Sequence, residues 1–299
     1  MLNSTRPREV VQPVLWRAED NGLRGASVRA AEGGLMAKVH KLRDPVHNFV
    51  HLREKEIKLI DTPVYQRLRR ISQLAMANLV YPGALHTRFD HSLGVCHVAG
   101  LMAEELGIEG DDLELVRLAA LLHDLGHGPF SHVSETSLKR FTDASKLPPG
   151  QKKEKIHELV TAKVIQGNKE IQQILAPQDR NKITELLSQG YGDPALKSIV
   201  SGPLDADKQD YLLRDSRYAG VTYGLYDIHQ LHRSLKIGDG DGGRELRIAA
   251  DGVPAVEQFV MAKYGMVQNG HFLGNSRHPR APWACSLRER VWGTVPQRC

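Results

Sequence analysis

Histidine and aspartate are the residues of this 299-residue chain best suited to chemistry, and they cluster. Seven of the 14 histidines fall between positions 86 and 157, most densely in LLHDLGHGPFSH at 121–132. The apolar run Leu118–Leu122 predicts a buried helix that delivers His123 and Asp124 to the interior. His127 follows four residues later, on the same helical face. Because buried ionisable groups need a partner or a metal ion, this stretch predicts a metal site.

Two adjacent ligands cannot complete a coordination sphere, so further ligands must come from elsewhere in the chain. His91 in RFDHSLG is one candidate. A second is one carboxylate of LDADKQDYLLRD, where spacing does not decide among Asp205, Asp207, Asp210 and Asp215. Imidazole and carboxylate together suit a divalent cation, namely Mn, Fe, Zn, Co or Mg. The sequence leaves the identity of that cation open.

Other histidines lack such a context. We interpret His86 and His97 as surface or hydrogen-bonded residues, and His229 and His232 as solvated positions on an amphipathic helix. The Gly/Asp-rich segment 238–243 resembles a calcium loop but lacks the terminal Glu that such a loop requires. We predict a hairpin turn there instead.

The apolar pattern predicts a mainly α protein. Three signals indicate helices: an N-cap followed by proline, apolar residues three to five apart, and a closing glycine. They predict helices over 62–79, 92–106 and 193–202, and two more that begin at 111 and near 205. Strand signals are few, with one strand at 46–52 and a hairpin that pairs 233–237 with 244–250. Segment 142–154 has the composition of an exposed loop.

The two ends differ from the rest of the chain. Residues 1–35 show no period and are predicted to be a disordered leader, with Met36 as an alternative start. Residues 36–270 form one patterned domain, and 271–299 form an irregular tail. The net charge of +5 resides in the two ends, because 36–270 are balanced. Nucleic-acid binding through the arginine-rich ends is therefore only an alternative hypothesis.

Composition excludes several classes. No apolar run approaches the roughly 18 residues that a membrane span requires, and the N-terminus lacks the apolar core of a signal peptide. Three cysteines without a CxxC pair exclude a disulfide scaffold and a thiolate zinc cluster. We therefore expect a cytoplasmic protein without a membrane partner.

Four long motifs carry a family resemblance. They are KLRDPVHNFVHL (41–52), PVYQRLRRISQLAMANLVYPGALHTRFDHSLGV (63–95), LLHDLGHGPFSH (121–132) and DADKQDYLLRDSRYAG (205–220). Together they resemble the HD-domain phosphohydrolases, and more narrowly their dNTP triphosphohydrolase branch, over roughly 37–263. The resemblance implies an HD-domain helical bundle with small β-hairpin additions.

The resemblance also implies roles for individual residues. The metal ligands implied are His91, His123, Asp124 and Asp207. The implied catalytic residues are His127, His132 as general acid, His157, and Glu135 as the acidic partner. The implied substrate contacts are Arg88, Lys208 and Tyr211 for triphosphate and sugar, Gln73 and Asp215 for the 3′-hydroxyl, Leu74 and Tyr211 against a 2′-hydroxyl, and Lys263 where relatives carry a phosphate-binding Arg.

Three functions follow as hypotheses. The first is metal-dependent hydrolysis of deoxynucleoside triphosphates to deoxynucleoside and tripolyphosphate, in a homo-oligomer. The second is an HD phosphohydrolase that acts on nucleoside monophosphates or other phosphoesters. The third is a truncated, non-catalytic fragment that binds nucleotide or a partner, because the resemblance stops after Phe272 and His271 replaces an expected Tyr.

Overall fold

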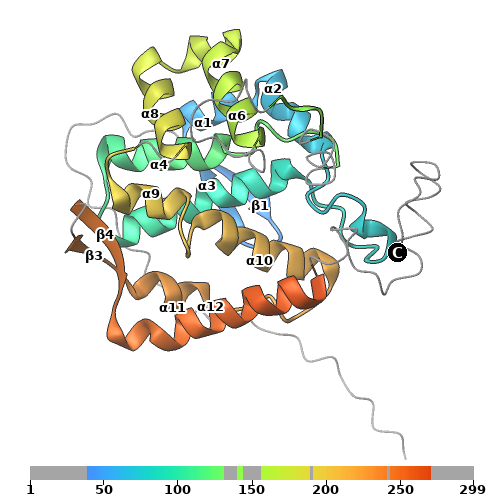
Figure 1. Ribbon diagram of the computed structural model, residues 1–299, viewed down its shortest axis with the longest axis vertical. Helices are drawn as coiled ribbons and strands as arrows, with labels where there is room; N and C mark the ends of the chain where they lie inside the picture. The colour runs from blue at the N-terminus through green and yellow to red at the C-terminus, as the bar shows by residue number, and fades with distance from the viewer. Residues whose placement is uncertain (1–38, 131–139, 144–155, 189–190, 241–242, 271–299) are drawn as a thin grey trace, which may run out of the picture. The chain divides into compact units, whose positions relative to one another are not determined.

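A computed structural model describes residues 39–130, 140–143, 156–188, 191–240 and 243–270. This part of the chain is mainly helical, with two small antiparallel hairpins (Figure 1). The helices are α1 (Glu54–Ile60), α2 (Pro63–Gln66), α3 (Arg88–Glu105), α4 (Gly110–Leu122), α6 (Ile156–Gly167), α7 (Lys169–Ile174), α8 (Pro177–Leu187), α9 (Pro194–Val200), α10 (Ala206–Ala219), α11 (Ile228–Arg233) and α12 (Val253–Gly265). The strands are β1 (His40–Asp44), β2 (Asn48–Leu52), β3 (Leu235–Gly240) and β4 (Gly243–Ile248). The prediction of a mainly α protein is confirmed.

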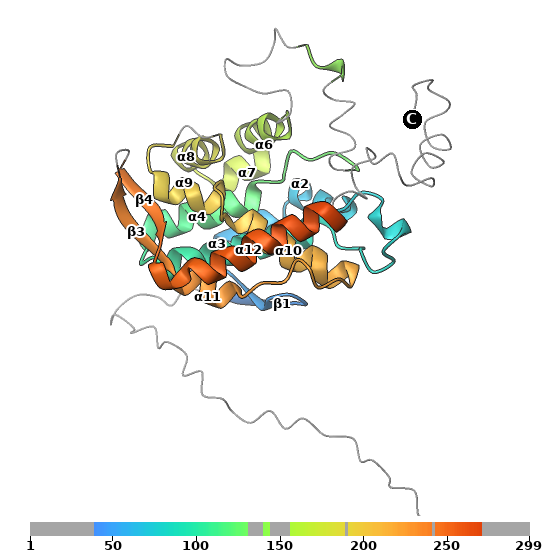
Figure 2. The same ribbon diagram turned by 60° about the horizontal axis from the view of Figure 1, so that its bottom comes forward.

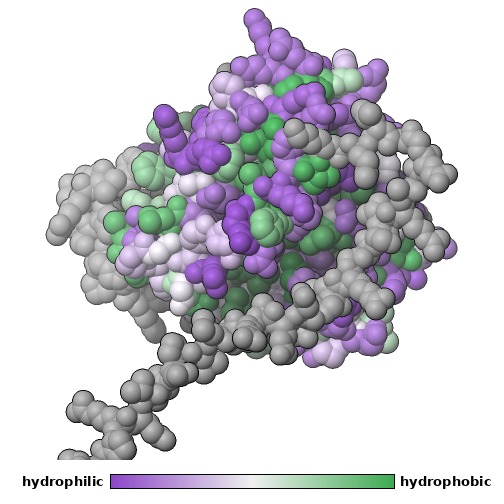
Figure 3. Space-filling view, turned by 180° about the vertical axis from the view of Figure 1, so that it is seen from behind, coloured by the Kyte–Doolittle hydropathy of each residue, from purple (hydrophilic) through white to green (hydrophobic). Residues whose placement is uncertain are grey.

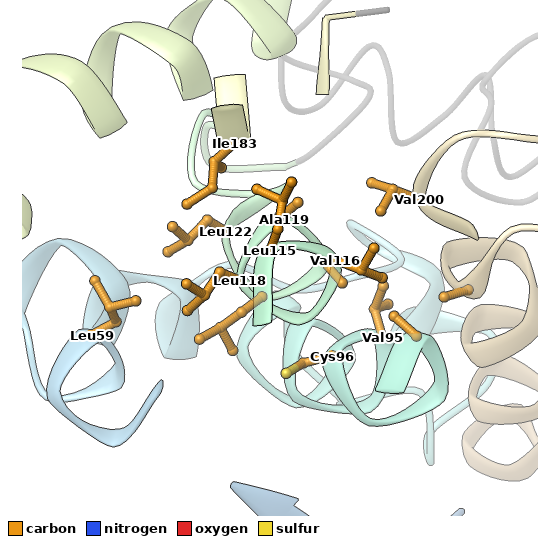
Figure 4. Packing of buried hydrophobic residues seen from close by; sticks show 14 of the residues in the cluster. Leu59, Val95, Cys96, Leu115, Val116, Leu118, Ala119, Leu122, Ile183 and Val200 are labelled. Carbon is orange, nitrogen blue, oxygen red and sulfur yellow. The ribbon is translucent and has the colours of Figure 1, made fainter. Parts of the chain in front are cut away.

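The core is built around α3 and α4. Figure 4 shows Val95 and Cys96 of α3 against Val116 and Leu118 of α4. Leu59 of α1, Ile183 of α8 and Val200 of α9 enclose the same cluster from other sides. Residues on every side of α3 are buried, as expected of a central helix without a solvent face.

Capping residues fix where the helices at the candidate site begin. Thr87 and Asp90 form a capping box at the start of α3, which places His91 in the first turns of that helix. Asp205 caps α10 by accepting from Lys208 N at 2.8 Å, so Asp207 lies in the first turn of α10. The chain thus delivers both residues from helix N-terminal ends.

A second, smaller cluster lies where α10, α11 and α12 meet. Leu212, Leu231 and Phe259 are buried together, and α12 runs alongside α10 in Figures 1 and 2. Among the described helices, none combines the length and apolar composition of a membrane span.

On the opposite face of the molecule, Figure 3 shows apolar residues interspersed among polar ones.

The helix predicted over 62–79 is wrong beyond its first turns. α2 ends at Gln66, a 3-10 helix follows at Arg67–Arg70, and another short one occupies Ala77–Leu79. Between them, Ser72 forms a β-bridge with Thr87, and Arg88 N donates to Ile71 O at 2.9 Å. The backbone groups of this segment therefore pair across the chain instead of along a helix.

The strand predicted over 46–52 is half of a hairpin. β2 begins at Asn48 and pairs with β1, which the sequence pattern did not reveal, and Asn48 takes a positive φ of 62° at the turn. The second hairpin is confirmed, with Leu235 opposite Ile248. The predicted leader at 1–35, the tail at 271–299 and most of the 142–154 loop lie outside the described residues.

Candidate metal centre

Three helical segments bring two histidines and an aspartate together. His91 comes from α3, His123 follows the last residue of α4, and Asp207 comes from α10. His91 Nε2 lies 3.0 Å and His123 Nε2 4.0 Å from the same Asp207 oxygen, Oδ1. One ligand atom from each residue lies within 4.8 Å of the other two. The His91 side chain is 1% exposed whereas that of Asp207 is 39% exposed, so the group is open on the Asp207 side.

Hydrogen bonding sets the tautomer of His123. Its Nδ1 lies 2.7 Å from Ala120 O, and because a carbonyl oxygen only accepts, Nδ1 must carry the proton. In the neutral ring the lone pair is therefore on Nε2, which faces Asp207. That Nε2 is buried and has no hydrogen-bond partner among the described residues. A buried acceptor of this kind fits a metal ligand, and the donor set of imidazoles and carboxylate fits a divalent cation.

Asp124 borders this group. Its Oδ1 lies 3.2 Å from His123 Nε2, while its Oδ2 lies 4.0 Å from His91 Nε2 and 2.5 Å from Arg88 Nη1. Burial alone would raise the pKa of Asp124, but the charge of Arg88 and the neighbouring His123 hold it well below its usual range. Asp124 is thus an ionised carboxylate beside the three-residue group, paired with a buried guanidinium.

The imidazolium of His91 and the carboxylate of Asp207 stabilise each other's charged forms. Burial alone would lower the pKa of His91, but its hydrogen bonds to Asp207 and Asp210 raise it to about 10. Partial burial would raise the pKa of Asp207, but the hydrogen bond from His91 lowers it to about 2. The protonated His91 ring therefore donates from Nε2 to Asp207 Oδ1 at 3.0 Å.

Two further imidazoles stand beside Asp124. The rings of His127 and His157 stack with centroids 4.2 Å apart, and His127 Nε2 lies 3.3 Å from Asp124 Oδ1. Burial lowers the pKa of His127 to about 4, despite the attraction of Asp124, so this imidazole is neutral at pH 7. The other two predicted catalytic residues, His132 and Glu135, lie outside the described residues.

The position of His157 depends on a contact that the sequence did not reveal. Thr161 of α6 accepts from Gly126 N at 2.8 Å and donates to His123 O at 3.0 Å. A Cβ on Gly126 would lie 2.1 Å from His157 O. Glycine at 126 therefore allows α6 to approach the end of α4 closely enough to stack the two rings.

The predicted sugar-binding residues share a second small assembly. Gln73 N donates to His86 O at 3.1 Å, beside the Ser72–Thr87 bridge. His86 Nε2 in turn lies 2.8 Å from Asp215 Oδ1, with both side chains buried. The segment that carries Gln73 is thus joined through His86 to Asp215, and His86 is hydrogen-bonded rather than on the surface. Leu74 is half-buried in the same segment.

The other residues predicted to contact substrate are not joined to one another or to the metal group by the hydrogen bonds described below. Lys208 Nζ donates to Asp205 Oδ2 at 2.5 Å and to Gly202 O at 3.0 Å, so it is held by its own helix start. Burial raises the pKa of the Tyr211 phenol. Lys263 lies half-buried in α12, and no hydrogen bond or ion pair within the described ranges joins it to the metal group.

One interpretation of an isolated histidine is wrong. His232 is not solvated, because the residue is 6% exposed and its Nε2 lies 2.7 Å from Gln209 Oε1. His229, on the same helix, is exposed as expected. His97 is buried, with its ring in edge contact with that of His47.

A buried helix that ends in His-Asp, together with a distant histidine and aspartate, defines a class of protein. Residues 88–197 match the family model of the HD domain, so this segment is an HD domain. The chain is 37% identical over 255 residues to the uncharacterized protein YwfO of Bacillus subtilis, covering 81% of this chain and 54% of that protein. It is 32% identical over 243 residues to the deoxynucleoside triphosphate triphosphohydrolase SAMHD1 of Homo sapiens, covering 70% of this chain and 37% of that protein.

A solved structure has a similar fold. It is that of a hypothetical protein from Aquifex aeolicus, with a TM-score of 0.68 and 31% identity over 86% of this chain and 66% of that one. The chain spans about half the length, or less, of the curated relatives described above.

Proposed function

We propose that this protein is a metal-dependent phosphohydrolase that converts deoxynucleoside triphosphates to deoxynucleoside and tripolyphosphate. The observation that carries the proposal is the convergence of His91, His123 and Asp207 from separate helices, with one ligand atom of each within 4.8 Å of the others. The HD-domain match over residues 88–197 supports the hydrolase chemistry, and similarity to a deoxynucleoside triphosphate triphosphohydrolase supports the substrate class.

The residues would hold the cation as follows. His91 and His123 would each offer Nε2, and Asp207 would offer Oδ1, with Asp124 as the adjacent fourth ligand. A divalent cation bound there would activate water and neutralise charge on the phosphate. The four side chains come from α3, the end of α4 and α10, so the cation would also tie these segments together.

The neighbouring side chains supply proton and charge chemistry. Hydrolysis at the α-phosphorus forms a bond to water oxygen, breaks the bond to the 5′-oxygen, and requires a proton for that leaving oxygen. The neutral imidazole of His127, held beside Asp124, would orient the attacking water by hydrogen bonding. The guanidinium of Arg88 beside Asp124 can offset phosphate charge. His132, the expected general acid, would complete the set.

The joined positions of Gln73, His86 and Asp215 support a sugar-binding role. Buried, hydrogen-bonded polar groups of fixed orientation discriminate strongly between substrates with and without a matching hydroxyl. Gln73 and Asp215 would contact the 3′-hydroxyl, and Leu74 with Tyr211 would leave no room for a 2′-hydroxyl.

Product analysis tests this proposal directly. The purified protein is incubated with each dNTP and with Mn²⁺ or Mg²⁺, and the products are separated by ion chromatography. We expect tripolyphosphate and deoxynucleoside in equal amounts, and little turnover of the corresponding ribonucleotides. His123→Ala should abolish turnover, and His229→Ala, which replaces an exposed histidine, should retain it.

Other products would refute the proposed reaction. Release of pyrophosphate or orthophosphate from dNTPs would contradict cleavage of the bond between the α-phosphorus and the 5′-oxygen. Turnover of nucleoside monophosphates, with triphosphates left intact, would favour the broader phosphohydrolase function. A folded protein that binds nucleotide without turnover under all metal conditions would favour the non-catalytic hypothesis.

A further inference from the structure

The side of His91 that faces away from the metal group is held by a buried carboxylate. Its Nδ1 lies 2.8 Å from Asp210 Oδ2, while its Nε2 faces Asp207. Because an ionised carboxylate only accepts, Nδ1 donates the hydrogen bond. This leaves Nε2 as the atom available to a cation. Asp210 therefore determines which nitrogen of His91 is presented and the direction in which it points.

Asp210 is itself fixed by three further hydrogen bonds. His47 Nε2 donates to Oδ1 at 2.7 Å, and Arg214 donates through Nε to Oδ2 at 2.8 Å and through Nη2 to Oδ1 at 2.9 Å. The Asp210 side chain is 0% exposed. Both carboxylate oxygens thus have two donors each, and the group has one orientation that satisfies all of them.

The support extends to the first hairpin. Arg214 Nη1 donates to Asp44 Oδ2 at 2.9 Å. Asp44 Oδ1 accepts from the backbone N of Val46 and of His47, both at 2.8 Å, which fixes the turn that carries His47. The turn between β1 and β2 is therefore connected to α3 through α10.

The backbone is shaped around these contacts. Gly94 lies one turn after His91 on α3, and a Cβ there would lie 1.9 Å from Asp210 Oδ1 and 2.3 Å from Arg214 Nη2. Any larger residue would displace the side chains of Asp210 and Arg214 from these positions. The close approach that lets Asp210 reach His91 therefore requires glycine at position 94.

The cost of this arrangement argues for a role beyond stability. Buried ion pairs contribute little net stability, because desolvation of the charges offsets their attraction. Carboxylates that accept from the second nitrogen of a metal-binding histidine, by contrast, orient the ring and increase its basicity. We propose that Asp210, supported by Arg214, His47 and Asp44, is a positioning residue that orients His91 for the cation. This inference rests on the metal centre of the proposed function.

Asp210→Asn in the full chain tests the inference. In either orientation, the amide sets an NH₂ group against one Arg214 donor, so the fixed orientation is lost along with the charge. We expect Mn²⁺ affinity, measured by isothermal titration calorimetry, to fall by about 10–100-fold. In the metal-free, ¹⁵N-histidine-labelled protein, the downfield Nδ1 proton of His91, assigned by its loss in His91→Gln, should move upfield. A structural role alone would not move this resonance.

Glu56→Gln is the matched control, because it breaks an equally buried carboxylate–arginine pair, Glu56 with Arg117, without touching His91. It should lower the melting temperature but leave Mn²⁺ affinity and the His91 resonance unchanged. If Asp210→Asn does not fold, His47→Ala removes one donor to Asp210 from a part-buried position, and should give a smaller loss of affinity with a shift of the same resonance.

The outcomes separate the two claims. Suppose that the wild type binds Mn²⁺, that folded Asp210→Asn or His47→Ala binds it with an affinity within about twofold of the wild type, and that the His91 resonance does not move. This result would overturn the positioning role but would leave the metal centre supported. Wild-type protein that binds no divalent cation would refute the metal centre, and the positioning role with it.

Discussion

The buried ring of His232 makes a prediction about stability that can be worked from the structure. Gln209 Nε2 donates to Leu204 O at 2.7 Å, so its Oε1 is the acceptor that faces His232 Nε2. The neutral ring satisfies this contact, whereas a second proton would add charge to a site that is 6% exposed. Burial, with a smaller contribution from His229 and His47, lowers the pKa of His232 to about 4.

The sign of the effect follows from linkage. In the unfolded chain the pKa of a histidine is about 6.5, so between pH 6.5 and about 4 the unfolded state binds more protons than the folded state. The free energy of unfolding therefore falls as the pH is lowered through this window. At pH 5, about 1.5 pH units into the window, His232 costs about 2 kcal/mol of the stability present at pH 7.5.

Urea unfolding at pH 7.5 and pH 5.0, with EDTA present so that metal loss does not contribute, measures this effect. His232→Gln removes the titration and should lose about 2 kcal/mol less stability on acidification than the wild type, whatever its stability at pH 7.5. His229→Gln, on the exposed side of the same helix, should behave as the wild type does. Equal losses in wild type and His232→Gln, within about 0.5 kcal/mol, would refute the reasoning, because additivity errors are of that size.

Three other predictions concern the pairs and contacts around the site. Glu56→Gln leaves Arg117 buried without its anionic partner and should cost about 3–5 kcal/mol in urea unfolding. A cost below about 1 kcal/mol would show that the buried Arg117 charge does not depend on Glu56. Thr161→Val removes the contacts to Gly126 N and His123 O and should cost about 1–3 kcal/mol and lower kcat, with Thr161→Ser restoring both; unchanged kcat would separate α6 from the chemistry. Mn²⁺ at 100 times its dissociation constant should stabilise the metal-free protein by about 2.7 kcal/mol, and an unchanged melting temperature would contradict the metal centre.

Local signals in the sequence predicted the position of His123 better than they predicted its surroundings. LLHDLGHGPFSH is a local signal, because the apolar helix and its His-Asp ending are contiguous in the chain, and the structure places His123 at the end of α4 as expected. Capping residues also act locally, which is why the starts of α9 and α10 were predicted at Asp193 and Asp205. Spacing did not choose among the carboxylates of α10; that choice came from the family resemblance.

The failures share a physical cause. Asp210 is 119 residues from His91 and 163 from His47 in the sequence. The spacing of apolar residues along one segment cannot predict a contact between residues so far apart. The same holds for Thr161, whose partners lie at the end of another helix. Segment 67–79 has helical spacing, but its backbone pairs with the 86–88 segment instead. Tertiary hydrogen bonds outweighed local propensity there.

The central helix explains why buried charges are retained in this core. Because α3 is buried all round, apolar packing gives it no single preferred face. Two arginines approach it closely at glycines: Arg214 at Gly94, and Arg117 at Gly100, where a Cβ would lie 2.1 Å from Arg117 Nη1. Arg214 is paired with Asp210 of its own helix and with Asp44 of β1, and Arg117 is paired with Glu56 of α1, so both guanidinium groups are held in place against α3. We infer that the Arg214–Asp210 pair, which meets α3 at Gly94, sets the rotation of the turn that carries His91. Since a helix turns by about 100° per residue, that rotation decides whether His91 faces Asp207 or the apolar core.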